Sequence, residues 1–175
     1  MRFFILDGKD LKLRYFVFFM ILAASVCAFI TAHSARVTTR EVRLYFVDAE
    51  MLRLIPVKMS VADSGDPQLM ARRLLDELIK GRDENPKIRR LIPDIKHCMT
   101  VSVRDGCAVV DIKRKMVENH PEGRDLELLT VYSVVNTLTG IDGVQTVRFT
   151  VEGKTQRDFM GYLDMRETFV PDFFV

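Results

Sequence analysis

The 175-residue chain contains 26 Lys and Arg residues against 24 Asp and Glu residues, and 48% of its residues are hydrophobic. Four of the basic and two of the acidic residues precede Tyr15, which leaves 22 of each sign from Arg36 onward. A neutral region lacks the cationic surface that dominates affinity for DNA and RNA, so we expect no nucleic-acid partner. The roughly 140 residues from Arg36 onward suffice for one domain with its own core.

An uncharged apolar run from Tyr15 to Ala32 follows a basic segment, residues 1–14. Its eighteen residues would form roughly 27 Å of helix, close to the ~30 Å hydrocarbon core of a bilayer. Four Lys and Arg residues precede the run and only Arg36 and Arg40 follow closely, which favours a cytoplasmic N-terminus. The sequence therefore predicts a single-pass anchor over residues 15–35 in the bacterial cytoplasmic membrane. Residues 36–175 would form an extracytoplasmic, periplasmic domain.

Two other fates of the N-terminal segment stay open. The small residues of Ala32–Ala35 offer a site where a signal peptidase could cut. Cys27 follows Ala24-Ser25-Val26, which is similar to a lipoprotein box, although Val26 replaces the usual small residue. We expect an uncleaved anchor because the apolar region of a cleaved signal is usually only about 7–15 residues long.

β-Branched and aromatic residues over Val42–Val47 predict a first strand. A second is expected over Arg53–Val61, where Pro56 indicates an edge or a bulge. Asp66-Pro67 is typical of the N-cap and first position of a helix, and Gly81 would end that helix. A charged loop follows, residues 82–93. The predicted buried stripe of the helix comprises Ala71, Leu74, Leu75 and Leu78.

Asp105-Gly106 lies between two alternating apolar runs and predicts a two-residue hairpin turn within Cys98–Ile112. This turn sets the register, with Arg104 opposite Cys107 and Val103 opposite Ala108. One face of the hairpin is then polar, so the hairpin covers a core with one side only. The apolar face comprises Met99, Val101, Val103, Ala108, Val110 and Ile112.

A second helix is expected from about Arg124 to Thr139 and a final strand over Val144–Val151. The order from Pro67 onward is helix, strand, strand, helix, strand. Two helices on one face of a mostly antiparallel sheet, with extra N-terminal strands, give an α+β fold. The residues that the second helix is expected to bury are Leu128, Leu129, Tyr132, Val135 and Leu138.

Cys98 and Cys107 raise the question of a disulfide, since the expected compartment is oxidising. The predicted register separates them by about 20 Å along the ladder, far beyond the ~7 Å that a disulfide allows between Cα atoms. Both are expected on the polar face as free thiols, and an intermolecular bridge is the alternative.

We expect no catalytic, cofactor-binding or metal-binding residues. The three histidines, His33, His97 and His120, lack the spacing of a metal site. His97 and Cys98 could be drawn as base and nucleophile, but neighbours on a strand point to opposite faces. The glycine patterns of nucleotide-binding proteins and serine hydrolases are also missing.

Six residues are candidates for contact with a partner: Thr100, Ser102, Arg104, Asn136, Phe173 and Phe174. The first three share the polar face of the hairpin. Asn136 is unusual inside a helix, where it either forms a hydrogen bond to the sheet or contacts a partner. The apolar C-terminal tail either folds back onto the core or docks on another protein.

Short segments from Val42 to Asp164 also carry a family pattern, of which Ser133–Leu138, SVVNTL, is the most specific. Together they resemble the GerMN domain of spore germination and sporulation proteins. Two departures are Ile112-Lys113, where the family usually has an aromatic residue and a serine, and Gly81-Arg82 in place of glycine-proline. The other segments are Leu44–Phe46, Ala71–Gly81, Ile92-Pro93, Asp105–Asp111, Glu127-Leu128, Val144–Val147, Glu152-Gly153 and Gly161–Asp164.

The resemblance implies a fold like the ring-building motif of secretion-system rings. It also implies a non-enzymatic envelope scaffold that supports a multiprotein complex of the sporulation or germination type, through an envelope protein partner or self-association. Family members are often lipoproteins or carry tandem copies, whereas this chain carries one copy. The alternative function is a binding module for a small ligand or cell-wall fragment, on the polar face around Thr100, Ser102 and Arg104.

Overall fold

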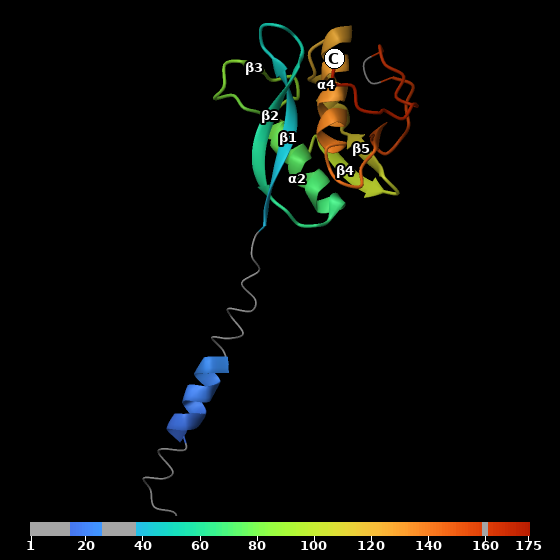
Figure 1. Cartoon of the computed structure of the whole chain (residues 1–175). Coiled ribbons are helices and arrows are strands. Elements are labelled where there is room, and N and C mark those ends of the chain that lie inside the picture. The colour runs from blue at the N-terminus through green and yellow to red at the C-terminus, as the bar shows by residue number, and fades with distance from the viewer. Residues whose placement is uncertain (1–14, 26–37, 159–160) are drawn as a thin grey trace, which may run out of the picture. The chain divides into compact units, whose positions relative to one another are not determined.

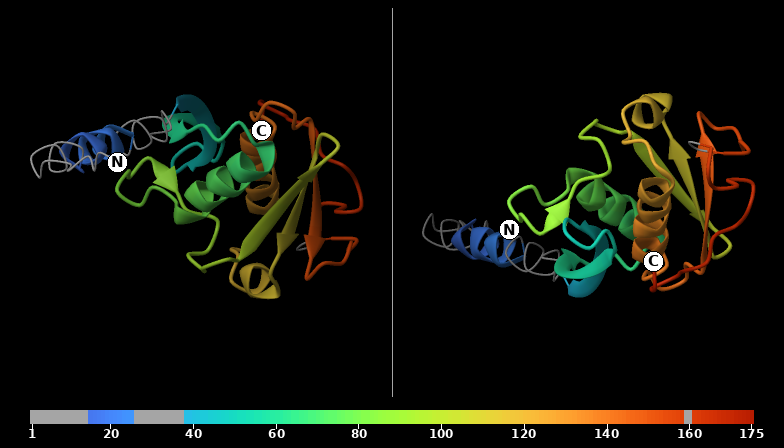
Figure 2. Two further views of the ribbon diagram at one scale, coloured as in Figure 1. Left: turned by 90° about the horizontal axis from the view of Figure 1, so that it is seen from below. Right: turned by 90° about the horizontal axis from the view of Figure 1, so that it is seen from above.

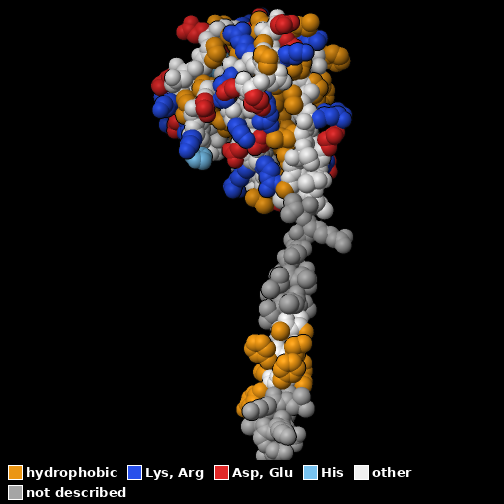
Figure 3. Space-filling model, turned by 90° about the vertical axis from the view of Figure 1, so that its left-hand side faces the viewer, with side chains coloured by type: hydrophobic (Ala, Val, Ile, Leu, Met, Phe, Trp, Pro, Cys, Tyr) orange, Lys and Arg blue, Asp and Glu red, His pale blue; other side chains and the backbone are white. Residues whose placement is uncertain are grey.

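A computed structural model describes residues 15–25, 38–158 and 161–175 of the chain. Two compact units are distinguished, Met1–Val37 and Thr38–Val175. In the first unit residues 15–25 are helical, and their exposed side chains are almost all apolar (Figure 3). Within the described ranges, no helix has both the length and the apolar character needed to span a bilayer. Residues 26–35 of the predicted anchor, with Cys27, lie outside those ranges.

The second unit contains two three-stranded sheets and the helices between them (Figure 1). The strand orders are β2-β1-β3 and β4-β5-β6. Figure 2 shows α2 and α4 lying between the β1–β2 hairpin and the β4-β5-β6 sheet. The elements, in chain order, are β1 (Thr39–Asp48), β2 (Leu54–Ala62), α2 (Pro67–Lys80), β3 (Ile88–Arg89), β4 (Met99–Arg104), β5 (Cys107–Ile112), α3 (Arg114–Glu118), α4 (Arg124–Leu138) and β6 (Thr146–Val151).

The predicted α+β order is confirmed as α2-β4-β5-α4-β6, with the short helix α3 inserted. Strands β4 and β5 are antiparallel, whereas β5 and β6 are parallel because α4 forms the crossover between them. The extra N-terminal strands form a sheet of their own. In that sheet β2 is an edge strand, which confirms the interpretation of Pro56.

The predicted limits of helix α2 are confirmed. The Asp66 carboxylate accepts a hydrogen bond from the backbone N–H of Gln68 at 2.9 Å, and Pro67 follows this N-cap. Gly81 ends the helix at φ 71°, a backbone angle that favours glycine. The residues that α2 buries are Met70, Ala71, Leu74, Leu75, Leu78 and Ile79.

The predicted hairpin register is also confirmed, with Arg104 opposite Cys107 and Val103 opposite Ala108. Asp105 and Gly106 have φ values of 50° and 76°, as a type I′ turn requires. The expected orientation of Cys98 is wrong, because this side chain is fully buried. Strand β4 begins only at Met99 and His97 has φ 56°, so the extended alternation does not reach Cys98.

Both Cys98 and Cys107 are free thiols, and they should react at different rates. Burial raises the pKa of the Cys98 thiol, whereas Cys107 is only half-buried. Because the thiolate is the reactive form, we expect a maleimide to label Cys107 at least tenfold faster than Cys98 in the folded protein. Timed labelling followed by peptide mass spectrometry measures both rates, and equal rates in urea provide the control. Faster labelling of Cys98 would contradict the burial of its side chain.

The predicted apolar stripe of α4 is wrong in part. Leu128 and Tyr132 are only half-buried, while the helix buries polar residues on several sides. The reason is that α4 contacts β1, α2 and β6 and is crossed by the C-terminal tail, so it has no fully solvated face. The buried polar residues of this helix are Glu127, Thr130, Ser133, Asn136 and Thr137.

Candidate functional site

Thr100, Ser102 and Arg104 lie on β4 and are exposed, as the hairpin register predicts. A cavity of about 450 Å³ lies beside the first two of these residues, and its lining also includes Arg72 and Asp76 of α2. A second cavity, of about 410 Å³, shares Asp76 and His97 with the first. We call the two together the α2–β4 groove. Arg104 does not line it.

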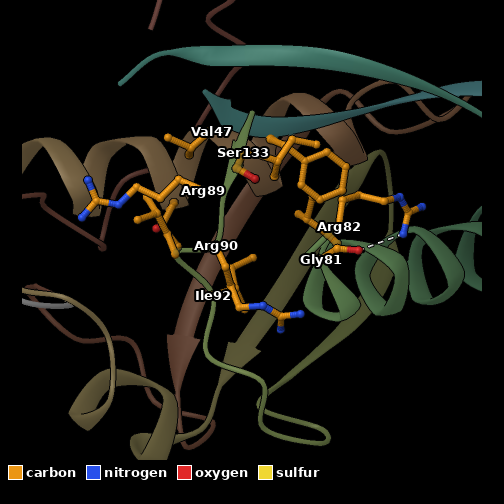
Figure 4. Close-up of a pocket in the computed structure, with 12 residues that line it drawn as sticks. Val47, Gly81, Arg82, Arg89, Arg90, Ile92 and Ser133 are labelled. Carbon is orange, nitrogen blue, oxygen red and sulfur yellow. Dashed lines mark hydrogen bonds between the residues drawn. The ribbon is translucent and has the colours of Figure 1, made fainter. Parts of the chain in front are cut away.

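A smaller cavity lies where α2 ends, beside Val47 and Ser133 (Figure 4). Its volume of about 20 Å³ suffices for one water molecule rather than a ligand. Figure 4 shows the Arg82 guanidinium turned back toward the Gly81 carbonyl, to which it donates a hydrogen bond at 2.9 Å. Arg90 donates to the carbonyl of Ile79 at 3.1 Å. Both arginines therefore support the C-terminal end of α2.

Asn136 connects α4 to the C-terminal tail. Its Nδ2 donates to the Asp172 carbonyl at 2.6 Å, and the Asp172 N–H donates to its Oδ1 at 3.0 Å. The side chain is 1% exposed, so it supports the tail and presents no surface of its own. The partner of Asn136 is therefore neither the predicted sheet nor a surface contact.

The C-terminal tail folds back onto the domain, which was one of the two predicted alternatives. The backbone of Phe169 pairs with Val147 of β6, and the Val175 carbonyl accepts from the N–H of Leu54 at 3.1 Å. The Phe173 ring lies 5.6 Å from that of Tyr45. Phe173 is nonetheless 58% exposed and Phe174 fully exposed, so both remain available at the surface.

Replacing Asn136 with alanine should lower the free energy of unfolding by about 2 kcal/mol, because two backbone groups of Asp172 lose their partner. The tail should also become more accessible, so limited proteolysis should remove residues after Phe169 faster than in the wild type. Urea unfolding and digestion with chymotrypsin measure the two effects. Gln145→Ala, at an exposed position outside the helix, is the control. Unchanged stability together with unchanged cleavage would contradict this role of Asn136.

The SVVNTL segment contacts the first strand through two hydroxyl groups. Ser133 Oγ donates to the Tyr45 carbonyl at 2.6 Å, and the Tyr45 N–H donates to Thr137 Oγ1 at 3.0 Å. Tyr45 lies opposite Pro56, which has no N–H, so the two form a pair without hydrogen bonds in the β1–β2 ladder. In such a pair the backbone N–H and C=O point away from the partner strand, and those of Tyr45 point toward α4. The helix thus satisfies an otherwise open strand edge.

Glu127 fixes the segment that begins at Gly161. Its carboxylate is fully buried and accepts from the backbone N–H groups of Tyr162 at 3.2 Å and Leu163 at 3.3 Å. Two of the short segments in the family pattern, Glu127-Leu128 and Gly161–Asp164, therefore meet in space. Nothing in the sequence pattern itself indicates this role of Glu127.

Asp111 performs a similar task on the open face of the sheet. Its carboxylate accepts from the Thr150 hydroxyl at 2.8 Å, from the Gly153 N–H and from Lys113 at 3.1 Å. Burial acts to raise the pKa of Asp111, but these donors outweigh it and hold the pKa below its ordinary value. The arrangement fixes the turn after β6, where Gly153 has φ 73°.

The described residues contain no group of three or more His, Cys, Asp or Glu side chains arranged to hold a metal ion. His97 is exposed while Cys98 is buried, so these two residues do not form a base and nucleophile pair. What the geometry provides is an α+β domain of the ring-building type, whose polar motif residues fix strands, turns and the tail.

A family profile described as "Germane: Sporulation and spore germination" matches residues 43–157, and the chain belongs to this family. No curated protein matches the chain. The first GerMN domain of the sporulation protein GerM from Bacillus subtilis aligns with a TM-score of 0.52 at 21% identity, covering 73% of this chain and 93% of that one.

Two further solved structures have the same fold. The tandem GerMN domains of the same protein align with a TM-score of 0.54 at 18% identity, covering 79% of this chain and 46% of that one. A candidate lipoprotein from Clostridium perfringens aligns with a TM-score of 0.54 at 15% identity, covering 77% of this chain and 89% of that one. The predicted GerMN-like fold is therefore confirmed.

Proposed function

We propose that this protein is a non-enzymatic scaffold of the bacterial cell envelope, which supports a multiprotein complex of the sporulation or germination type. One observation carries the proposal: the polar residues of the family pattern form internal hydrogen bonds. Ser133 and Thr137 fix β1, Glu127 fixes the segment at Tyr162, and Asp111 fixes the turn at Gly153. A domain that uses its polar residues in this way offers a rigid surface for contacts.

The N-terminal segment would hold this scaffold at the cytoplasmic membrane as a single-pass anchor, with the domain outside. The support is the uncharged run from Tyr15 to Ala32 and the basic residues before it. Intact mass spectrometry of the protein extracted from membranes tests this proposal against the two other fates. We expect the full-length mass. A chain that begins after Ala32–Ala35 would show that the segment is a cleaved signal. A chain that begins at a lipidated Cys27 would show that the protein is a lipoprotein. Either result would contradict the anchor.

Crosslinking in intact cells, followed by mass spectrometry, tests the scaffold proposal. We expect discrete oligomers or one dominant protein partner. Failure to recover any protein partner, together with a glycan that raises the melting temperature, would contradict the proposal.

The second candidate function is a binding module for a small ligand or cell-wall fragment. The α2–β4 groove supports it, since volumes of about 300–1,000 Å³ are typical of ligand sites and a cavity of about 450 Å³ lies beside Thr100 and Ser102. Glycan fragments that raise the melting temperature of the wild type, but not of a Thr100→Ala/Ser102→Ala variant, would favour this function.

A further inference from the structure

The free edge of β4 borders the α2–β4 groove. Strand β4 is the outer strand of its sheet, and the Lys113 N–H donates to the Cys98 carbonyl at 2.8 Å. In an antiparallel pair the backbone groups of alternate residues point toward the partner strand. The backbone groups of Thr100, Ser102 and Arg104 therefore point toward β5. Those of Met99, Val101 and Val103 point outward.

Gln68 of α2 occupies one half of this edge. Its Nε2 donates to the Val101 carbonyl at 2.9 Å, and the Val103 N–H donates to its Oε1 at 2.6 Å. One side-chain amide thus takes the place of a residue in a neighbouring strand. This arrangement protects half of the edge against pairing with other chains.

The other half of the edge remains open. Among the described residues, the C=O of Met99 and the N–H of Val101 have no hydrogen-bond partner, while the N–H of Met99 faces the Cys98 thiol. Met99 is 3% exposed and Val101 5% exposed, so these groups lie at a largely buried position next to a cavity of about 450 Å³. Unpaired backbone groups at such positions are rare because each costs about 1–3 kcal/mol.

We propose that an extended segment of a protein partner adds as a strand to β4 at Met99 and Val101, within the α2–β4 groove. This inference rests on the scaffold function and specifies how the partner binds. Backbone groups that alternate along an extended strand are complemented by another extended backbone. A second copy of this chain fits poorly, because its own Gln68 already occupies the Val101 carbonyl and the Val103 N–H and leaves only half of its β4 edge to pair.

The surroundings of the edge define the chemistry of the partner segment. Residues of that segment on the helix side would meet Leu75, Met99 and Val101, which favours aliphatic side chains at alternate positions. The rim of the groove carries Arg72, Lys80 and Lys96 together with Asp76 and Asp94. This mixed rim favours a segment with little net charge and polar residues at the positions between.

Selection from a random nine-residue peptide library, displayed on phage, tests the inference with the full chain in detergent. We expect enriched peptides with alternating aliphatic and polar residues, and at least tenfold slower hydrogen exchange at the amides of Met99 and Val101 when they bind. Val101→Pro should weaken binding at least tenfold, because it removes the outward-facing N–H of residue 101. It removes no hydrogen bond between β4 and β5, so the sheet should still form. Gln68→Ala should strengthen binding several-fold by opening the rest of the edge.

Asp76→Trp serves as a second variant in case Val101→Pro fails to fold, since it fills the groove from α2 and leaves the strand intact. Lys115→Trp, at an exposed position on α3, is its matched control and should bind peptides like the wild type. Absence of enriched peptides, or equal binding by the Asp76→Trp and Lys115→Trp variants, would overturn the inference. An in-cell protein partner that survives Asp76→Trp would also overturn it, and would leave the scaffold proposal standing.

Discussion

Replacing Glu127 with alanine is expected to lower the free energy of unfolding by about 4 kcal/mol. The substitution leaves the N–H groups of Tyr162 and Leu163 without this acceptor. It also leaves a cavity between α4 and the segments packed against it. Because Glu127 is fully buried, water does not readily replace the carboxylate. Urea unfolding followed by circular dichroism measures the change.

Two further variants make the Glu127 prediction specific. Glu127→Gln keeps one acceptor oxygen and nearly the same volume, so about half of the loss is expected. Glu122→Ala removes a carboxylate from an exposed position five residues earlier and should change stability by less than about 0.5 kcal/mol. If Glu127→Ala were as stable as Glu122→Ala, Glu127 would have no structural role.

The double substitution Ser133→Ala/Thr137→Val is expected to lower the free energy of unfolding by about 3 kcal/mol. Both changes nearly preserve volume, but the N–H and C=O of Tyr45 then lose their partners at the edge of β1. The two hydroxyls bind the same residue, so the single substitutions should not add up simply. Denaturant unfolding of the wild type, both single variants and the double variant gives the coupling.

Thr139→Val provides the matched control for this pair. Thr139 lies one residue after α4, and its hydroxyl donates only to the Val135 carbonyl of the same helix, at 2.8 Å. Its replacement should therefore change stability by less than about 0.5 kcal/mol. A double variant that is no less stable than Thr139→Val would show that α4 does not need these hydroxyls to hold β1.

The sequence predicted the elements whose signals are local. Asp66 caps α2 by accepting a hydrogen bond from the N–H of Gln68, only two residues later. Asp105 and Gly106 adopt positive φ angles within their own turn. Such features depend on a few neighbouring residues, which a single sequence displays directly. The register that followed from this turn also placed Thr100 and Ser102 correctly on an exposed face.

The role of α4 depended on distant segments and was predicted less well. Ser133 and Thr137 bind Tyr45 across 88 and 92 residues of sequence, and Asn136 binds Asp172 across 36. An amphipathic stripe of leucines assumes one solvated face, which this helix does not have. The four-residue spacing of Ser133 and Thr137 was a usable signal, because it places two hydroxyls on one side of an apolar helix.

Most of the candidate site could not be predicted from local sequence patterns. The groove exists because α2 lies along the edge of β4, and Gln68 reaches Val101 and Val103 across 33 and 35 residues of sequence. The error at Cys98 had a different cause, since strand alternation was extended one residue past the start of β4. The left-handed backbone of His97 interrupts that alternation.

The scaffold function is tested most directly by the mass of the protein after crosslinking in intact cells. We expect the 20.2 kDa chain to shift into discrete species of higher mass that contain one dominant protein partner or further copies of itself. Glu127→Ala, which disturbs the fold, should reduce these species, whereas Glu122→Ala should not. A chain recovered only as a monomer, at the same level in the wild type and both variants, would contradict the scaffold function.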